Sequence, residues 1–254
     1  MHSSDKVALV TGGAKRIGAA IVKDLAAHGF AVAIHSNRST AEAAALAGAI
    51  ARAGGKAAAV NADLTEIRQA ETLIERASAA LGPIRLLVND ASIFKDDSAL
   101  DPDFAIWERH FAIHLKAPVL LASKLAAQLP EGQEGLVVNI IDQRVWKLTP
   151  QYFSYTLSKS ALWTATRTLA QALAPKVRVN AIGPGPTLAS SRQDPSDFDA
   201  QIDGLIMKHG PALGEFGATI RYLWEARSVT GQMIALDGGQ HLAWQTPDVT
   251  GMKE

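Results

Sequence analysis

Short apolar runs alternate along the chain with longer segments in which apolar residues recur every three or four positions. The runs are typical of buried strands, and the longer spacing indicates one face of a helix. Strands are predicted at 6–11, 30–35, 56–61, 85–89, 136–141, 177–182 and 232–236. Helices are predicted at 16–28, 40–53, 66–81, 103–129 with a bend near Pro118, 151–174 and 217–226.

Strands that alternate with helix-length segments predict βαβ units, in which crossovers join parallel strands. The expected fold class is therefore α/β, a doubly wound parallel sheet of Rossmann type with helices on both faces. No low-complexity linker or repeat divides 1–254, so a single domain is expected. Residues 184–215 lack clear periodicity and exceed ordinary loop length, which predicts a lid over a substrate site.

Composition narrows the class of protein. The 254 residues are 48% hydrophobic and 20% charged, with a formal net charge of zero. This balance gives no electrostatic case for binding nucleic acid or an anionic membrane surface. The absence of cysteine excludes disulfides, thiolate nucleophiles and cysteine-held metals. Charges interrupt every long apolar stretch and the N-terminal run does not read as a signal peptide, so a cytoplasmic protein without a metal is expected.

A glycine-rich turn, residues 11–18 (TGGAKRIG), follows the first predicted strand and opens the first helix. Glycines at such a place let the backbone approach a pyrophosphate, and the helix N-terminus supplies N–H groups and a favourable dipole. A dinucleotide is therefore expected at Gly12, Arg16, Ile17 and Gly18. A tight connection without a ligand is the alternative for such a turn taken alone.

The second predicted strand ends without the acidic residue with which NAD sites accept from the ribose 2′-hydroxyl. Arg38 and Arg16 are suited instead to a 2′-phosphate, which they would hold by charge-assisted hydrogen bonds with help from Ser39 and His35. The pattern predicts NADPH in preference to NADH. The alternative is that both arginines are solvated surface residues.

Tyr155 and Lys159 lie four residues apart on a predicted helix and so share a face. A phenol has a reference pKa of about 10, and a nearby ammonium lowers it. Tyr155 would then act as general acid toward a reduced carbonyl or imine. The same spacing is common on helix surfaces, so its meaning depends on the rest of the chain.

The motifs together resemble the short-chain dehydrogenase/reductase family over nearly the whole chain. They are the glycine turn, 61–64 (NADL), 89–92 (NDAS), Tyr155 with Lys159, 179–180 (VN), 184–185 (PG) and 237–239 (DGG). The resemblance implies a seven-stranded sheet of order 3-2-1-4-5-6-7 and a homotetramer or homodimer.

The same resemblance implies roles for individual residues. Lys159 would hold the nicotinamide ribose, and Thr187, after Pro184 and Gly185, is the nearest candidate for a hydroxyl that holds the carboxamide or a phosphate. The remaining cofactor contacts implied are Asp63 and Leu64 beside the adenine, Asn89 and Ala91 along the cofactor, and Ser92.

Four positions depart from the general family pattern. Arg16 replaces a usual glycine, and the segment 89–92 differs from the usual Asn-Asn-Ala-Gly. Asp142 stands at the catalytic serine position, and His114 replaces a helix asparagine that supports a proton-relay water. The turn at 14–16, the stretch from His35 to Ser39, the pair 91–92, Asp142 and Phe94 resemble the pteridine reductase branch. His114 and the tail 237–242 resemble bacterial dihydromonapterin reductases.

A pterin suits these residues chemically. Its flat ring would lie between Phe94 and the nicotinamide, with Arg16 and Ser92 near it. Asp142 would accept from its N–H groups and, with Tyr155, supply the proton that reduction of a C=N bond requires. Alternatives stay open: Phe94 packs under the 184–215 segment, Asp142 caps a turn, and His114 is a satisfied helix histidine.

Three functions therefore compete. The first is an NADPH-dependent pterin reductase of the dihydropteridine or dihydromonapterin type with Asp142, Tyr155, Lys159 and His114 as catalytic residues. The second is a carbonyl or 3-oxoacyl reductase of the same family. The third is an NADPH-binding sensor without turnover, since a fold does not fix a function. Retention of Tyr155 and Lys159 favours an enzyme.

Overall fold

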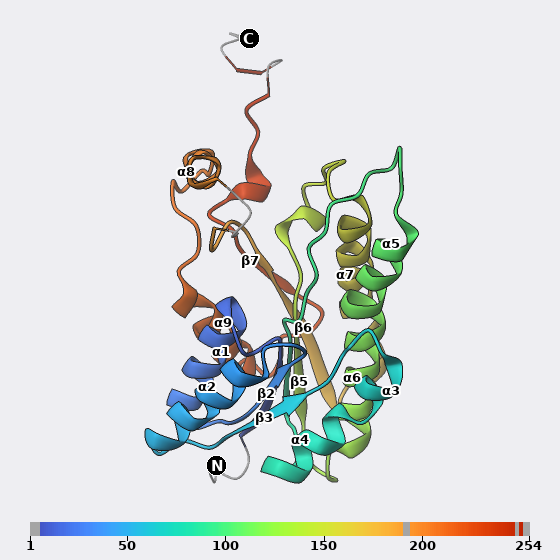
Figure 1. Cartoon of the computed structure of the whole chain (residues 1–254), viewed down its shortest axis with the longest axis vertical. Coiled ribbons are helices and arrows are strands. Elements are labelled where there is room, and N and C mark those ends of the chain that lie inside the picture. The colour runs from blue at the N-terminus through green and yellow to red at the C-terminus, as the bar shows by residue number, and fades with distance from the viewer. Residues whose placement is uncertain (1–5, 190–193, 247–248, 251–254) are drawn as a thin grey trace.

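One parallel sheet organises the chain (Figure 1). The computed structural model describes residues 6–189, 194–246 and 249–250. Within them, seven strands lie in the order β3-β2-β1-β4-β5-β6-β7, which confirms the predicted fold class and strand order. The strands are β1 (Val7–Thr11), β2 (Ala31–Ser36), β3 (Ala57–Asn61), β4 (Leu86–Asn89), β5 (Gly135–Ile140), β6 (Val177–Pro184) and β7 (Met233–Leu236).

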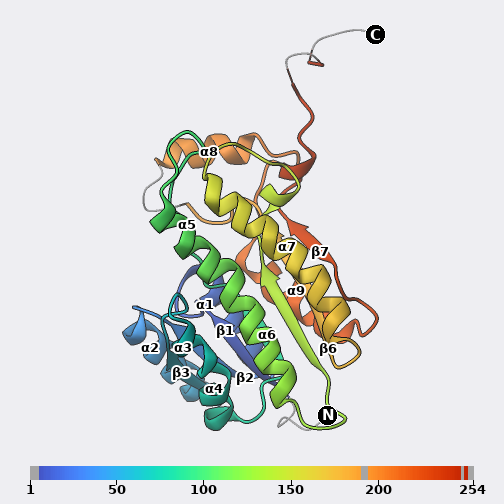
Figure 2. The same cartoon turned by 90° about the vertical axis from the view of Figure 1, so that its right-hand side faces the viewer.

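Helices cover both faces of the sheet. One face carries α1 (Arg16–Ala27), α2 (Thr40–Arg52) and α9 (Leu213–Glu225), whose apolar residues form one core cluster with the strands. The other carries α3 (Ile67–Glu71), α4 (Leu73–Leu81), α5 (Phe104–Phe111), α6 (Ala117–Gln128) and α7 (Phe153–Leu173). Figure 2 shows α7 lying beside α5 and α6, and α8 (Pro195–Asp203) across the end of the sheet.

The two faces explain why the strands are apolar without alternation. In β1, Val7 and Leu9 join the core cluster beneath α4 and α6, whereas Ala8 and Val10 join the cluster beneath α1 and α9. Successive side chains of a strand point to opposite faces, so a sheet covered on both sides needs apolar residues at every position.

Some helices differ from the predicted segments. The helix expected at 103–129 consists of α5, a π-helix (Ala112–Lys116) and α6, so the irregularity lies before Pro118 and not at it. The helix expected at 66–81 divides at Thr72 into α3 and α4. The segment 184–215, which lacks clear periodicity in sequence, contains α8, which Asp194 caps by accepting from the Ser196 N–H at 2.9 Å. No helix in the described parts of the chain has the length and apolar character needed to cross a bilayer.

Candidate active site

The glycine turn is shaped by backbone conformations that few side chains tolerate. Gly12 has φ +67° and Arg16 has φ +51°, and the left-handed region is uncommon for residues other than glycine. A Cβ on Gly18 would lie 2.4 Å from the carbonyl oxygen of Gly12. The turn therefore closes tightly on the first turn of α1, and the positive φ of Arg16 accounts for the glycine that the family usually has there.

The Arg16 side chain is bonded to the segment that follows β6. Its guanidinium donates to the carbonyl oxygens of Leu188 at 3.0 Å and Ala189 at 3.1 Å. The side chain thus joins the glycine turn to the segment after β6. The sequence analysis expected Arg16 and Arg38 to hold one phosphate together, and the structure does not bring the two side chains together.

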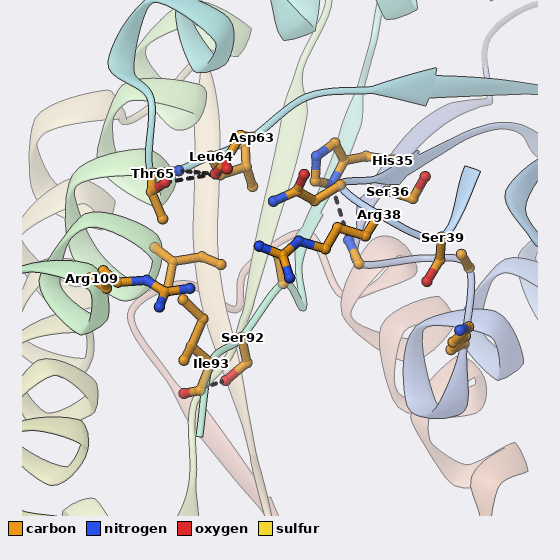
Figure 3. Close-up of a pocket in the computed structure, with 16 residues that line it drawn as sticks. His35, Ser36, Arg38, Ser39, Asp63, Leu64, Thr65, Ser92, Ile93 and Arg109 are labelled. Carbon is orange, nitrogen blue, oxygen red and sulfur yellow. Dashed lines mark hydrogen bonds between the residues drawn. The ribbon is translucent and has the colours of Figure 1, made fainter. Parts of the chain in front are cut away.

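A pocket of about 340 Å³ opens at the carboxyl ends of β1, β2 and β3, beside the glycine turn. Arg38 and Arg109 extend into it from opposite sides, Arg38 after β2 and Arg109 on α5 (Figure 3). Arg109, which the sequence analysis did not select, therefore lies across the pocket from Arg38. The pocket is lined by Gly12, Ala14, Lys15, His35, Ser36, Asn37, Arg38, Ser39, Asp63, Leu64, Thr65, Ala91, Ser92, Ile93, Arg109 and Ile113.

His35 fastens the glycine turn to the sheet. Its Nδ1 accepts from the Gly12 N–H at 3.1 Å, so the proton lies on Nε2, which donates to the Ala62 carbonyl at 3.0 Å. Burial lowers the pKa of His35 to about 4, so the ring stays neutral. Both ring nitrogens are thus committed to the backbone, and the ring positions the turn.

Asp63 closes the adjoining wall of the pocket. Its Oδ1 accepts from the Thr65 N–H at 2.9 Å and from the Thr65 hydroxyl at 2.7 Å. Burial acts to raise the pKa of Asp63, but hydrogen bonds from Thr65 and Asn37 outweigh it, so the pKa lies below the usual range. The carboxylate is therefore ionised and fixed beside Leu64.

Asp142 and Tyr155 share a hydrogen bond at the start of α7. The Tyr155 hydroxyl donates to Asp142 Oδ2 at 2.9 Å, and Oδ1 accepts from the Arg144 N–H at 2.9 Å. Asp142 therefore caps the short helix that follows it and also binds Tyr155. The sequence analysis had given these two roles as alternatives. Lys159 donates to the Ile140 carbonyl at 2.8 Å, and its Nζ lies 5.7 Å from the centre of the Tyr155 ring.

The charges of this cluster are set mainly by burial. Tyr155 is 6% exposed, and burial together with the adjacent Asp142 carboxyl raises its pKa well above 10. Burial also raises the pKa of Asp142 and lowers the pKa of Lys159 to about 8. The sequence predicted that Lys159 would lower the pKa of Tyr155, whereas burial, together with the bonded Asp142, raises it. Tyr155 holds its proton firmly.

Phe94 forms an aromatic wall with Tyr152. The two rings stack with centroids 4.1 Å apart, and Phe94 meets Tyr155 edge-on at 4.7 Å. The Arg144 guanidinium carbon lies 5.2 Å from the centre of the Tyr152 ring. Phe94 remains 38% exposed, so ring surface stays accessible beside the reactive hydroxyl. Tyr152 has a left-handed backbone conformation, φ +53°, and directs the chain into α7. No local sequence pattern indicates this conformation.

Several predicted residues support the site from within the protein. The Asn89 amide donates to Asn139 at 2.8 Å across the sheet, and Thr187 donates to the Gly185 carbonyl at 3.1 Å. A Cβ on Gly185 would lie 2.7 Å from Asp237 Cα, so this chain segment packs directly on the end of β7. These contacts hold 184–187 next to the sheet edge.

His114 is buried behind Tyr155, and both of its ring nitrogens bind protein groups. Nδ1 lies 2.8 Å from the Ser158 hydroxyl, and Nε2 accepts from the Ile93 N–H at 3.2 Å. These bonds leave neither nitrogen to hold a relay water. Of the two roles that the sequence left open, the geometry favours the satisfied helix histidine.

Asp90 is a further residue whose role the sequence did not indicate. Its carboxyl lies against the backbone N–H of Gly18, and burial raises its pKa to about 7. Thr11 Oγ1 accepts from the N–H groups of Asp90 at 3.0 Å and Ala91 at 3.1 Å. The end of β4 is thereby fixed against the glycine turn.

The chain is similar in sequence and in fold to known proteins. The short chain dehydrogenase family profile matches residues 6–199. FolM alternative dihydrofolate reductase 1 from Brucella suis, solved in complex with NADP, is 62% identical, with a TM-score of 0.95 over 98% of this chain and 100% of that chain. The dihydromonapterin reductase of Klebsiella pneumoniae is 31% identical over 67% of this chain and 72% of its own length. A 3-oxoacyl-[acyl-carrier-protein] reductase of Synechocystis is 28% identical over 92% of this chain and 96% of its own length.

Proposed function

This chain belongs to the short-chain dehydrogenase family, and we propose that it is an NADPH-dependent reductase of a pterin ring, of the dihydrofolate, dihydropteridine or dihydromonapterin type. The observation that carries the proposal is the Tyr155–Asp142 hydrogen bond, 2.9 Å long, beside the partly exposed ring of Phe94. The similarity to FolM alternative dihydrofolate reductase 1 and to dihydromonapterin reductase supports the same substrate class.

The pocket fits NADPH in both shape and charge. The tight glycine turn leaves backbone N–H groups at the start of α1 for a pyrophosphate. Two guanidinium groups, Arg38 and Arg109, extend into the part of the pocket that follows β2, where a 2′-phosphate would be held. The bound cofactor supplies a hydride to the substrate.

The remaining contacts of the cofactor are assigned by the family pattern on these residues. Asp63 and Leu64 would flank the adenine, and Ser39 would assist the arginines. The pyrophosphate and nicotinamide half would be held by Gly12, Ile17, Gly18, Asn89, Ala91, Ser92, Tyr155, Lys159, Pro184, Gly185 and Thr187.

Proton supply follows from the state of Tyr155 and Asp142. Reduction of a C=N bond needs a hydride at carbon and a proton at nitrogen. Tyr155 keeps its proton at neutral pH and presents it next to Asp142, whose oxygens accept N–H groups such as those at the edge of a pterin. The buried Lys159 is the nearby cation that offsets negative charge developing on this pair.

A comparison of two substrates tests the proposal. Purified protein with NADPH is expected to turn over a dihydropterin and to leave an acetoacetyl thioester nearly unreacted. Rapid thioester reduction without pterin turnover would overturn the proposal and would indicate a 3-oxoacyl reductase, the activity in the name of the Synechocystis relative. Tight NADPH binding without turnover of either substrate would indicate a sensor.

The family resemblance also supports a cytoplasmic homotetramer or homodimer with one domain and a lid at about 184–215. The bonds from Arg16 to Leu188 and Ala189 tie the start of this segment to the glycine turn. Residues 190–193 of the segment lie outside the described residues. Sedimentation equilibrium measures the oligomer, and a monomer at micromolar concentration would contradict it.

A further inference from the structure

Two buried histidines lie side by side behind Tyr155, one on α5 and one in the π-helix that follows. His110 is 0% exposed and His114 is 1% exposed. Their rings are nearly parallel at 17°, with centroids 5.5 Å apart. Both meet the Tyr155 ring edge-on, His114 at 5.2 Å and His110 at 5.9 Å. The proposed proton transfer uses neither ring.

The hydrogen bonds of His114 determine where its proton lies. The Ser158 hydroxyl donates to the Tyr155 carbonyl at 2.7 Å, so its oxygen accepts from His114 Nδ1 at 2.8 Å. Nε2 of the neutral ring then has no proton. It accepts from the Ser92 hydroxyl at 2.9 Å and the Ile93 N–H at 3.2 Å.

His110 repeats this arrangement one helical turn earlier. Its Nε2 accepts from the Lys95 N–H at 3.4 Å, so Nδ1 carries the proton and donates to the Ser154 hydroxyl at 2.7 Å. The Ser154 N–H in turn donates to the Asp97 carboxylate at 3.0 Å. Burial lowers the pKa of both histidines, which keeps the Nε2 atoms free to accept.

The repeat forms a ladder with two rungs. Each rung runs from a serine of α7 through a histidine ring to a backbone N–H of the segment 92–95. The two N–H donors belong to Ile93 and Lys95, which flank Phe94 on either side. The ladder therefore fixes the backbone of Phe94 at both ends relative to the helix that carries Tyr155.

We propose that His110 and His114 are positioning residues, which hold Phe94 against Tyr155 as the wall of the substrate slot. His114 on this reading replaces the relay asparagine of the family with a direct link between protein segments. The inference rests on the proposed function for its substrate, a pterin, but the ladder itself does not depend on which ring-shaped substrate the slot accepts.

Two conservative variants of His114 separate positioning from relay. In His114→Gln the amide oxygen replaces the Nε2 acceptor for Ile93 and Ser92, whereas in His114→Asn the amide nitrogen replaces the Nδ1 donor to Ser158. Positioning predicts that His114→Asn raises the KM for the dihydropterin about tenfold, the equivalent of one buried hydrogen bond, with kcat nearly unchanged. His114→Gln is expected to stay within about threefold of the parent, because the bond to the Phe94 segment survives.

The relay model predicts the opposite order, since asparagine is the residue that holds the relay water. Parent-like KM and kcat in His114→Asn, with loss of activity in His114→Gln, would overturn the proposal. A Phe94→Ala background sharpens the test, because the effect of His114→Asn on KM should then disappear if His114 acts through Phe94. A full tenfold effect in that background would mean that His114 acts by another route.

Readouts without turnover keep this test separate from the substrate assignment. Nitrogen NMR of the imidazole rings is expected to find both histidines protonated at Nδ1 at neutral pH. Hydrogen exchange of the Ile93 amide should accelerate in His114→Asn, and that of Lys95 in His110→Asn. His28→Asn, at an exposed position after α1, is the control and should change neither amide.

The ladder would be contradicted if the NMR spectra placed the histidine protons on Nε2. It would also be contradicted if the His114→Asn and His110→Asn variants left the amide exchange rates unchanged. Both results are independent of the substrate that the enzyme reduces. The proposed function fails in a different way, by absence of pterin turnover while the Nδ1 protons and the protected amides remain. The two conclusions can therefore be rejected independently.

Discussion

Replacing Asp90 with asparagine should stabilise the protein at alkaline pH. The Asp90 carboxyl lies against the Gly18 N–H, inside the turn that closes on α1. Burial raises its pKa from 3.8 to about 7, against the opposing effects of Lys159, the Gly18 hydrogen bond and Arg16. Asparagine is close in shape, keeps an oxygen for the Gly18 N–H and removes the cost of burying a charge.

The sign and size follow from proton linkage. Below pH 4 the carboxyl is protonated in both the folded and the unfolded chain, so the stability that a raised pKa provides is fully present there. It is lost as the pH rises through about 7, the pKa of folded Asp90. A pKa raised from 3.8 to about 7 corresponds to about 4 kcal/mol for a fully buried charge. Asp90 is partly exposed, so solvent screens part of its charge and the expected difference is about 2 kcal/mol.

Urea unfolding of the ligand-free protein measures the difference. The free energy of unfolding of Asp90→Asn should exceed that of the parent by about 2 kcal/mol at about pH 8, and the gap should close toward about pH 4.5, with equal m values. Asp101→Asn, at an exposed position, controls for the loss of one formal charge. A gap that is independent of pH, or a less stable Asp90→Asn at the higher pH, would refute the reasoning.

Three predictions address the active site. Tyr155→Phe should lower kcat by about 10²- to 10⁴-fold, because the proton donor is lost. The NADPH dissociation constant should stay within about twofold, because the cofactor pocket is unchanged. Steady-state kinetics measures kcat, and fluorescence titration measures the dissociation constant. Arg109→Ala should weaken NADPH by about tenfold or more and leave NADH nearly unchanged, because one charge-assisted bond to the 2′-phosphate is lost; equal losses for both cofactors would mean that Arg109 does not contact this phosphate. Asp142→Ser should impair dihydropterin reduction far more than reduction of a simple ketone, measured as kcat/KM on each, and equal losses would mean that Asp142 is structural.

The sheet was predictable from sequence because its physical signal is local. A strand buried on both faces is apolar over most of its length, as β1 is from Val7 to Val10, and a run of this kind is visible without a structure. The π-helix was not predictable, since one extra residue in a turn leaves the spacing of apolar residues almost intact. The start of α8 did carry a signal, an aspartate followed by proline, of the kind that caps helices.

The site was predictable where neighbours in sequence are neighbours in space. The bond from Tyr155 to Asp142 joins α7 to the turn after β5, and the family spacing of both residues anticipates it. Arg109 could not be found in this way, because it reaches the pocket from α5, far from Arg38 along the chain. The bond from Arg16 to the Leu188 carbonyl could not be found for the same reason, because the two residues are far apart along the chain.

Two departures from the family pattern, Asp142 and His114, are related through the proton of Tyr155. A nearby ammonium lowers the pKa of a phenol, whereas a nearby carboxylate raises it. Here the Asp142 carboxyl raises the pKa of Tyr155 further than burial alone does, so the proton is stored on the pair itself. His114 has both ring nitrogens on protein groups, Ser158 and the Ile93 N–H, and this agrees with the positioning role that we propose for it. The same reasoning explains why Lys159 is retained, since a buried cation is still required to balance the negative charge once the proton has left.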